Sequence, residues 1–176
     1  GVRRAADGAA GELSQKQLDL VSRIDRNGRR LLALIEDLLL NSRIESGQLH
    51  LARRPCDLAE IVDHAWESTG ALTQRRELRL RRHIADQPVP VDGDATALER
   101  VVSNLLSNAV KFTPDGGIVT VSLDATQADN GAWMARIVVS DSGYGISEED
   151  LHQVFRRFFR SSDATERAVQ GTGLGL

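Results

Sequence analysis

The stretch Asn104-Leu-Leu-Ser-Asn108-Ala-Val-Lys111 decides how the rest of the chain is interpreted. Two later stretches, Asp141-Ser-Gly-Tyr-Gly145 and Gly171-Thr-Gly-Leu-Gly175, follow it in an order that would build one nucleotide pocket. Each is a weak signal by itself, because polar helix faces and glycine turns are common. Their joint occurrence makes nucleotide binding the leading hypothesis.

The first stretch predicts a helix with one polar face. Arg100, Asn104, Asn108 and Lys111 are spaced so that they share that face. Asparagine is a poor helix former because its amide competes for backbone hydrogen bonds, so two of them indicate either a ligand site or a solvated face. A carboxamide oxygen suits Mg²⁺, and a lysine supplies a point charge for phosphate. Asn104, Asn108 and Lys111 are therefore candidate catalytic residues.

The same helix should begin near Thr96 and pack its other side on a core. Thr96 with Glu99 three residues later resembles a capping box, which predicts the helix start. The face opposite the polar one is predicted to hold Leu98, Val101, Leu105, Ala109 and Phe112.

The second stretch predicts an acidic residue on a glycine turn at a strand end. Asp141 follows the apolar run 133–140, and Gly143 and Gly145 let the backbone approach a flat ring closely. The carboxylate can accept a hydrogen bond from the exocyclic amine of adenine. The alternative is an ordinary turn with no ligand.

The third stretch offers backbone N–H groups to phosphates. It comprises Gly171, Thr172, Gly173, Leu174 and Gly175. It differs from the dinucleotide-binding fingerprint, since its last glycine comes one residue too early and a polar loop precedes it where that motif has a strand.

A long amphipathic helix is predicted from Ser14 to about Ile44. Its apolar residues recur at steps that keep one stripe on one face, with charged residues between them. These are Leu20, Ile24, Leu31, Ile35, Leu38 and Leu39. No upstream segment can cover the stripe, so we expect it to pack on another helix, from elsewhere or from a second copy.

The remaining pattern mixes helices and strands without βαβ regularity. Ser46-Gly47 and Pro55 predict a hinge, with a short strand at 50–53. A helix at 58–75, strands at 77–84 and 88–94, a hairpin of 118–123 with 133–140, and a short helix at 148–155 complete the prediction. The expected fold class is α+β: a two-layer α/β sandwich with a mixed, mainly antiparallel sheet, preceded by a long helix.

Composition narrows the class of protein. The chain has 176 residues, 41% hydrophobic and 27% charged, which is ordinary for a globular protein. Its net charge of -3 offers no broad basic surface for nucleic acid. One cysteine excludes an internal disulfide, and no apolar run approaches a membrane helix, so a cytoplasmic location is expected. The first residue is not Met and the last lies inside a glycine motif, so we expect a piece of a longer protein.

These motifs together resemble the ATP-binding catalytic domain of sensor histidine kinases, within the wider group of gyrase, Hsp90 and MutL type ATPases. The family's asparagine box is matched by Asn104 and Asn108, and its first glycine box by Asp141, Gly143 and Gly145. Its phenylalanine box is matched by Phe155, Phe158 and Phe159, and its second glycine box by Gly171, Gly173 and Gly175. The resemblance implies ATP with Mg²⁺ as cofactors.

The resemblance also implies roles for single residues. Asn108 would hold Mg²⁺, Asp141 would read adenine, and Arg160 would contact phosphate. The segment 161–170 would be the mobile ATP lid. The end of the long helix, Asn41-Ser-Arg-Ile-Glu-Ser-Gly47, looks like the second helix of the family's dimerisation and phosphotransfer hairpin. That hairpin implies a homodimer through the N-terminal helix.

The chain departs from the family pattern at both ends. None of His50, His64, His83 and His152 has the acidic neighbour expected of a phosphoacceptor. We expect residues 1–46 to be part of the dimerisation segment and 47–176 an ATP-binding domain truncated at its C-terminus.

The implied function is transfer of the γ-phosphoryl of ATP to a histidine outside this chain, for relay to an aspartate on a response regulator receiver domain. Two alternatives stay open: an ATP- or ADP-binding regulatory module, and a serine kinase of the anti-sigma type.

Overall fold

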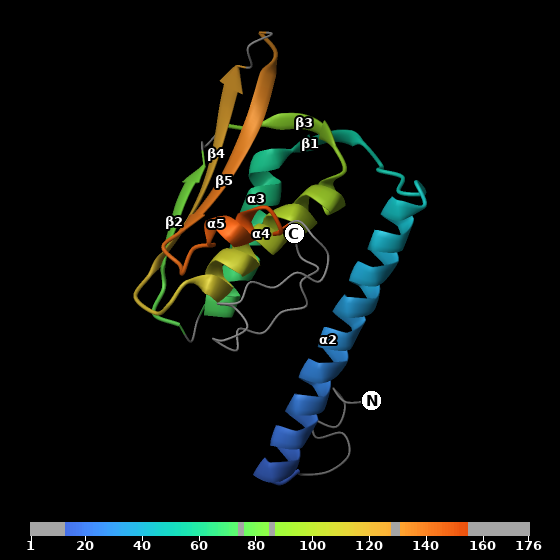
Figure 1. Ribbon diagram of the computed structural model, residues 1–176, viewed down its shortest axis with the longest axis vertical. Coiled ribbons are helices and arrows are strands. Elements are labelled where there is room, and N and C mark those ends of the chain that lie inside the picture. Colours follow the sequence, from blue (N-terminus) through green and yellow to red (C-terminus); the bar gives the residue numbers. More distant parts are fainter. Residues whose placement is uncertain (1–12, 74–75, 85–86, 128–130, 155–176) are drawn as a thin grey trace. The chain divides into compact units, whose positions relative to one another are not determined.

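The computed structural model describes residues 13–73, 76–84, 87–127 and 131–154. The chain divides into two compact units, Gly1–Leu49 and His50–Leu176. Their elements are labelled in Figure 1. Within the described residues, no helix combines the length and the apolar character that crossing a membrane requires.

The first unit is built on one long helix, α2 (Gln15–Glu45). Ser14 is its N-cap: the hydroxyl accepts a hydrogen bond from the backbone N–H of Gln17, whose own side chain accepts from the backbone N–H of Ser14. The helix ends at Glu45 with Ser46 as its C-cap, and Gly47 after it adopts φ +65°, a conformation that costs other residues energy. The predicted start at Ser14 is confirmed, and the observed end lies one residue beyond the predicted one.

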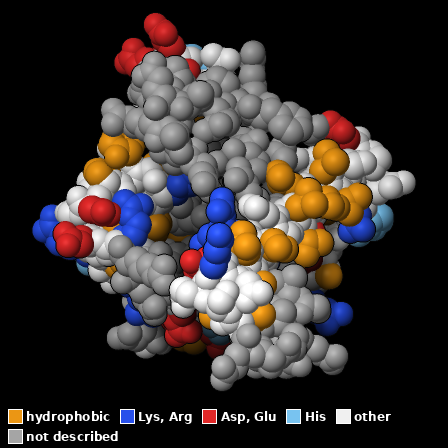
Figure 2. Space-filling model, turned by 90° about the horizontal axis from the view of Figure 1, so that it is seen from below, with side chains coloured by type: hydrophobic (Ala, Val, Ile, Leu, Met, Phe, Trp, Pro, Cys, Tyr) orange, Lys and Arg blue, Asp and Glu red, His pale blue; other side chains and the backbone are white. Residues whose placement is uncertain are grey.

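The apolar stripe of α2 is largely exposed. Its large hydrophobic side chains are 45% to 61% accessible. They are Leu20, Ile24, Leu31, Leu32, Ile35, Leu38 and Leu39. Figure 2 shows hydrophobic side chains exposed side by side on the surface seen from below. Seven large hydrophobic side chains exposed along one helix face are unusual on a surface that faces only water.

The second unit interleaves helices and strands. Its elements are β1 (Arg54–Asp57), α3 (Leu58–Thr73), β2 (Arg79–Ile84), β3 (Pro90–Gly93), α4 (Ala95–Phe112), β4 (Ile118–Gln127), β5 (Trp133–Asp141) and α5 (Glu148–Leu151). The strand predicted at 50–53 is wrong in position, because the observed strand β1 begins four residues later, at Arg54. The pairing with β3 explains the shift, because Cys56 lies opposite Val91 and Asp57 opposite Pro90.

The strands form two sheets. β1 and β3 make a two-stranded antiparallel sheet, and the larger sheet has the order β2-β4-β5. β4 and β5 pair as the predicted antiparallel hairpin, with Val121 opposite Val139. β2 runs parallel to β4, with Arg79 opposite Ile118 and Ile84 opposite Leu123. The sheet is therefore mixed, as the sequence predicts.

The core lies between the larger sheet and two helices, α3 and α4, which pack on each other (Figure 1). β4 alternates, burying Val119, Val121 and Leu123 while the residues between them stay half-exposed. The helical side of the core is formed by Leu58, Ile61, Val62, Ala65, Val102 and Leu106. This arrangement is the expected two-layer α/β sandwich.

Two details of α4 differ from prediction. The N-cap is Asp94, whose Oδ1 accepts from the backbone N–H of Ala97 at 3.1 Å, so the proposed box of Thr96 and Glu99 is wrong. Thr96 already lies inside the first turn, where its hydroxyl cannot cap the helix.

The buried face of α4 also differs. It consists of Val102, Leu106, Ala109 and Val110, and of the predicted apolar set only Ala109 is buried. Val101 is 56% exposed. Each residue turns a helix by about 100°, so choosing 101 in place of 102 moves the predicted stripe toward the polar face.

Candidate nucleotide site

The polar face of α4 lies opposite its buried face. Asn104, Asn108 and Lys111 are all half-buried and project from the side of the helix that faces away from Val102 and Leu106. The Lys111 ammonium lies 4.6 Å from the centroid of the Phe112 ring, a cation–π contact that holds the charge at the C-terminal end of the helix. The predicted catalytic residues therefore share one half-exposed surface.

The predicted adenine reader closes a turn at the end of β5. Asp141 is the last residue of the strand and is exposed, and its Oδ1 accepts from the backbone N–H of Gly143 at 2.8 Å. Ser142 ties the turn to β4, because its N–H donates to the Ile118 carbonyl and its hydroxyl accepts from the Ile118 N–H. These bonds fix the direction of the Asp141 carboxylate. Oδ2 accepts no hydrogen bond from a described residue.

The turn after β5 meets the C-terminal end of α4. The backbone N–H of Tyr144 donates to the carbonyl of Phe112 at 3.3 Å. A Cβ on Gly143 would lie 2.6 Å from that same carbonyl oxygen, so this position requires glycine. Two predicted motifs that are far apart in sequence thus share a backbone contact.

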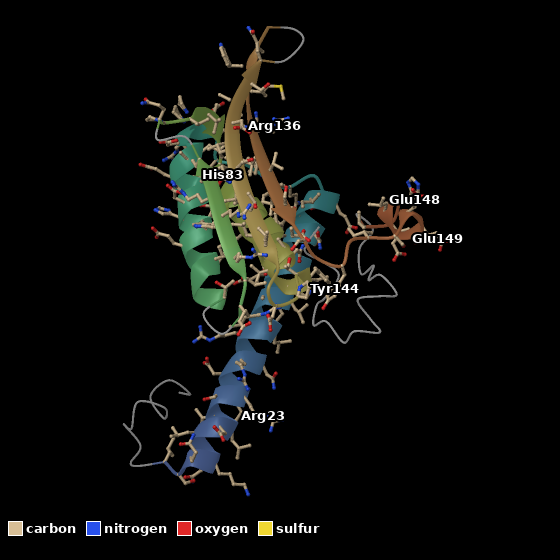
Figure 3. All side chains as sticks on the ribbon, turned by 90° about the vertical axis from the view of Figure 1, so that its left-hand side faces the viewer. Arg23, His83, Arg136, Tyr144, Glu148 and Glu149 are labelled. Carbon is tan, nitrogen blue, oxygen red and sulfur yellow. The ribbon has the colours of Figure 1, made fainter. Side chains whose placement is uncertain are left out.

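The site lies at the end of β5 that is remote from the hairpin turn. Figure 3 shows Arg136 toward the hairpin end and Tyr144 beyond the other end. Glu148 and Glu149, in the first turn of α5, lie away from the sheet. Gly145 adopts φ +72°, which only glycine reaches without strain, and redirects the chain toward α5.

Several predicted site residues lie outside the described residues. They are Arg160, Gly171, Thr172, Gly173, Leu174 and Gly175, together with Phe155, Phe158, Phe159 and the segment 161–170. The structure thus brings together two of the three predicted motifs.

Sequence reasoning missed a residue at the other end of α4. The Asp94 carboxylate accepts from the N–H of Ala97 and, at 2.9 Å through Oδ2, from the N–H of Ala52. The hydrogen bonds from Ala97 and Ala52 lower the pKa of Asp94 below its usual 3.8. An Asp immediately before a helix was a usable signal for the cap, but nothing local pointed to Ala52.

A second missed residue is Arg76, which contacts the C-terminal end of α4. Its guanidinium donates to the carbonyls of Val110 and Thr113 and pairs with Asp115. No local sequence pattern could predict these contacts, because the partners of Arg76 lie 34 to 39 residues further along the chain.

Metal binding by acidic or histidine clusters finds no support in the described part of the chain. There, no group of three or more His, Cys, Asp or Glu side chains gathers so that it could hold a metal ion. The oxygen donors on the polar face of α4 are the amides of Asn104 and Asn108.

Comparison with known proteins identifies the family of this chain. Residues 93–176 match the family model described as Histidine kinase-, DNA gyrase B-, and HSP90-like ATPase. The solved structure of a mycobacterial sensor histidine kinase, MprB, is 36% identical, with 70% of this chain and 73% of that chain covered at a TM-score of 0.56.

Longer relatives resemble nearly the whole chain. The histidine protein kinase DivJ of Caulobacter vibrioides is 38% identical over 94% of this chain, and the sensor histidine kinase RcsC of Escherichia coli is 39% identical over 89% of it. This chain spans 27% of the length of DivJ and 16% of that of RcsC. The structure of full-length ShkA in complex with AMPPNP shares the fold over 96% of this chain, with a TM-score of 0.72 at 24% identity.

Proposed function

Because the chain belongs to the sensor histidine kinases and carries their ATP-binding catalytic domain, we propose that it binds ATP between the polar face of α4 and the turn after β5. The observation that carries this proposal is the contact between Tyr144 and the Phe112 carbonyl, which joins the asparagine helix to the Asp141 turn. A ligand that touches both would be held at two points of one rigid scaffold.

Asp141 recognises the adenine in this proposal. One carboxylate oxygen is used within the turn, and because Asp141 is exposed the other can accept a hydrogen bond from the exocyclic amine of adenine. Guanine carries a carbonyl at the corresponding position and cannot donate there. Gly143 has no room for a side chain, so the turn that carries Asp141 packs directly against the Phe112 carbonyl.

Asn108 holds Mg²⁺, with Asn104 and Lys111 beside it. Mg²⁺ keeps several waters and takes few protein ligands besides phosphate oxygens, so one amide oxygen on a half-exposed helix face fits its coordination. The bound metal would neutralise charge on the phosphates. Lys111 adds a positive charge one turn along the same face.

Further contacts come from the part of the domain after α5. The family model extends to residue 176, and on that ground we assign Arg160 to a phosphate and Gly171, Thr172, Gly173, Leu174 and Gly175 to the phosphate cradle. The segment 161–170 would cover the bound nucleotide.

In the intact protein, the γ-phosphoryl group passes to an acceptor histidine. The bond between the γ-phosphorus and the bridging oxygen breaks, a bond to an imidazole nitrogen forms, and ADP leaves. The residues of this chain contribute by positioning the phosphates and compensating their charge.

The two predicted segments of the chain have separate tasks in this proposal. Residues 1–46 belong to a dimerisation and phosphotransfer segment that pairs with a second copy through α2, and residues 47–176 form the ATP-binding domain. A receiver domain of a response regulator then takes the phosphoryl group on an aspartate. We accordingly propose a cytoplasmic location, either for the whole protein or for the cytoplasmic part of a membrane-anchored sensor.

Calorimetric titration with a non-hydrolysable ATP analogue tests the pocket. Asn108→Ala should weaken Mg²⁺-dependent binding at least about tenfold, because a metal ligand is lost. Asp141→Ala should weaken binding as much and reduce the preference for ATP over GTP analogues. Ser107→Ala is the matched control, since Ser107 is exposed on the same helix and has no proposed role. Binding that neither Asn108→Ala nor Asp141→Ala alters would contradict the proposal.

Phosphotransfer needs its own experiment. A dimerisation hairpin that contains an acceptor histidine is supplied in trans with labelled ATP. The expected product is an acid-labile phosphohistidine. An acid-stable phosphoserine would favour the serine kinase alternative, and nucleotide binding without any transfer would favour the regulatory module.

A further inference from the structure

The C-terminal end of α4 is held by a side chain from outside the helix. The guanidinium of Arg76, in the segment between α3 and β2, donates from Nη1 to the Val110 carbonyl at 3.1 Å and from Nη2 to the Thr113 carbonyl at 2.7 Å. Its Nε donates to Asp115 Oδ1 at 2.8 Å. One planar group therefore bonds the last turn of the helix and the loop that follows it.

These bonds satisfy groups that the helix itself leaves unpaired. The last four carbonyls of an α-helix have no partner within the helix. In α4 the Ala109 carbonyl accepts from the N–H and hydroxyl of Thr113, and the Phe112 carbonyl accepts from Tyr144. Arg76 supplies the donor for Val110, and its positive charge also suits the negative end of the helix dipole.

The last turn of α4, which Arg76 holds, is next to the proposed ligand contacts. Val110 lies between Asn108 and Lys111, and Thr113 begins the loop that leads to β4. The same turn presents the Phe112 carbonyl to the Asp141 turn, where Gly143 has no room for a side chain. A small rotation of this helix end would move both halves of the site against each other.

We infer that Arg76 is a positioning residue for the nucleotide: it fixes the last turn of α4, and through it Asn108, Lys111 and the Asp141 turn. The inference rests on the proposed function. This positioning role depends on the two hydrogen bonds to the Val110 and Thr113 carbonyls. The ion pair with Asp115 matters less, because Asp115 is 61% exposed and surface ion pairs contribute little. A lysine has a single ammonium on a flexible chain and cannot reproduce the forked contact with both carbonyls.

The experiment compares Arg76→Met, Arg76→Lys and Asp115→Asn in the intact kinase. The control is Arg82→Met. Arg82 also pairs with an aspartate, Asp63, and is 38% exposed against 32% for Arg76, but it bonds no α4 carbonyl in that pair. The dissociation constant for the ATP analogue is measured with Mg²⁺, and hydrogen exchange is followed at residues 110–117 and 141–146.

Arg76→Met should weaken nucleotide binding about tenfold and raise hydrogen exchange in both segments, since a displaced helix end misplaces its ligands. Arg76→Lys should stay weakened despite its charge. Asp115→Asn and Arg82→Met should change affinity less than about twofold.

The inference is overturned if Arg76→Met binds nucleotide as Arg82→Met does, or if Arg76→Lys restores both affinity and exchange protection. If Arg76→Met does not fold, the Arg76→Lys and Asp115→Asn results decide by the same criteria. Failure of the wild-type protein to bind nucleotide would instead count against the proposed function, and so the two failures are distinguishable.

Discussion

Helices α2 and α4 are both amphipathic, but they use their apolar faces differently. In α4, Val102 and Leu106 are 1% and 0% exposed, packed against α3 and the larger sheet. In α2, Leu31 and Leu32 remain 59% and 61% exposed. Helix α4 is therefore stabilised inside its own unit, whereas the apolar stripe of α2 is left exposed, as the proposed pairing with a second copy requires.

The difference separates two kinds of sequence information. A helix whose apolar face is buried within its own unit leaves its polar face open to a ligand, the role proposed here for Asn104 and Asn108 of α4. A helix whose apolar face is exposed has that face available for assembly, the role proposed here for α2. The same periodicity thus fits a ligand site in one helix and an interface in the other, depending on whether neighbouring elements cover the apolar face.

The largest expected effect comes from truncating one leucine in each helix. Leu106→Ala should lower the free energy of unfolding by about 2 to 5 kcal/mol, because it leaves a cavity in the core. Leu31→Ala should cost less than about 1 kcal/mol when the chain is dilute and monomeric. Urea unfolding of both variants measures the contrast. Equal losses would show that α2 is also packed within the monomer.

The assembly role of α2 is tested by placing charge on its stripe. Leu31→Glu with Leu38→Glu should weaken self-association by about a hundredfold, since charged groups would enter an apolar seam. Nucleotide affinity should stay unchanged, because α4 keeps its own packing. Sedimentation equilibrium measures the association.

The matched control for that pair is Ser22→Glu with Ala33→Glu, which adds the same charges at exposed positions on the other side of α2. Equal weakening by both pairs would indicate general charge repulsion and would remove the case for a specific seam.

The smallest effect concerns the N-terminal caps of the two helices. Ser14 and Gln17 cap α2 without an ionisable group, whereas α4 begins at the carboxylate of Asp94. Since the folded pKa of Asp94 lies below its ordinary 3.8, its contribution to stability is complete above that value and is lost as pH falls through the folded pKa. The unfolding temperature should therefore fall more steeply in acid for the wild type than for Asp94→Asn.

Nuclear magnetic resonance gives a local test of the same cap. The amide signals of Ala97 and Ala52 should shift together with a single apparent pKa, because both N–H groups donate to one carboxylate. Two separate midpoints, or a shift of the Ser14 and Gln17 signals in the same pH range, would contradict this explanation.

Local signals account for what the sequence predicted correctly. The start of α2 at Ser14 and the β4–β5 hairpin depend on neighbouring residues, and both are confirmed. So are the α+β class and the family, because several motifs had to agree.

The missed features depend on distant partners or on small rotations. The position of β1 depends on its pairing with β3, and the contacts of Arg76 depend on how the unit closes. Val101 and Val102 are equally apolar, so only the packed core shows which one faces inward. The pattern of Thr96 with Glu99 misplaced the cap because a capping-box sequence can also occur within the first turn of a helix, here after the true cap Asp94.

The parallel pairing of β2 with β4 has a consequence for how the domain folds. Parallel neighbours cannot be joined by a tight turn, so the chain between Ile84 and Ile118 must close as one large loop, and that loop contains α4. Closing it costs entropy before any contact between the strands compensates, which slows the step. We therefore expect the asparagine helix to become fixed together with the sheet. A half-folded chain that has only its β4–β5 hairpin would lack the proposed nucleotide site.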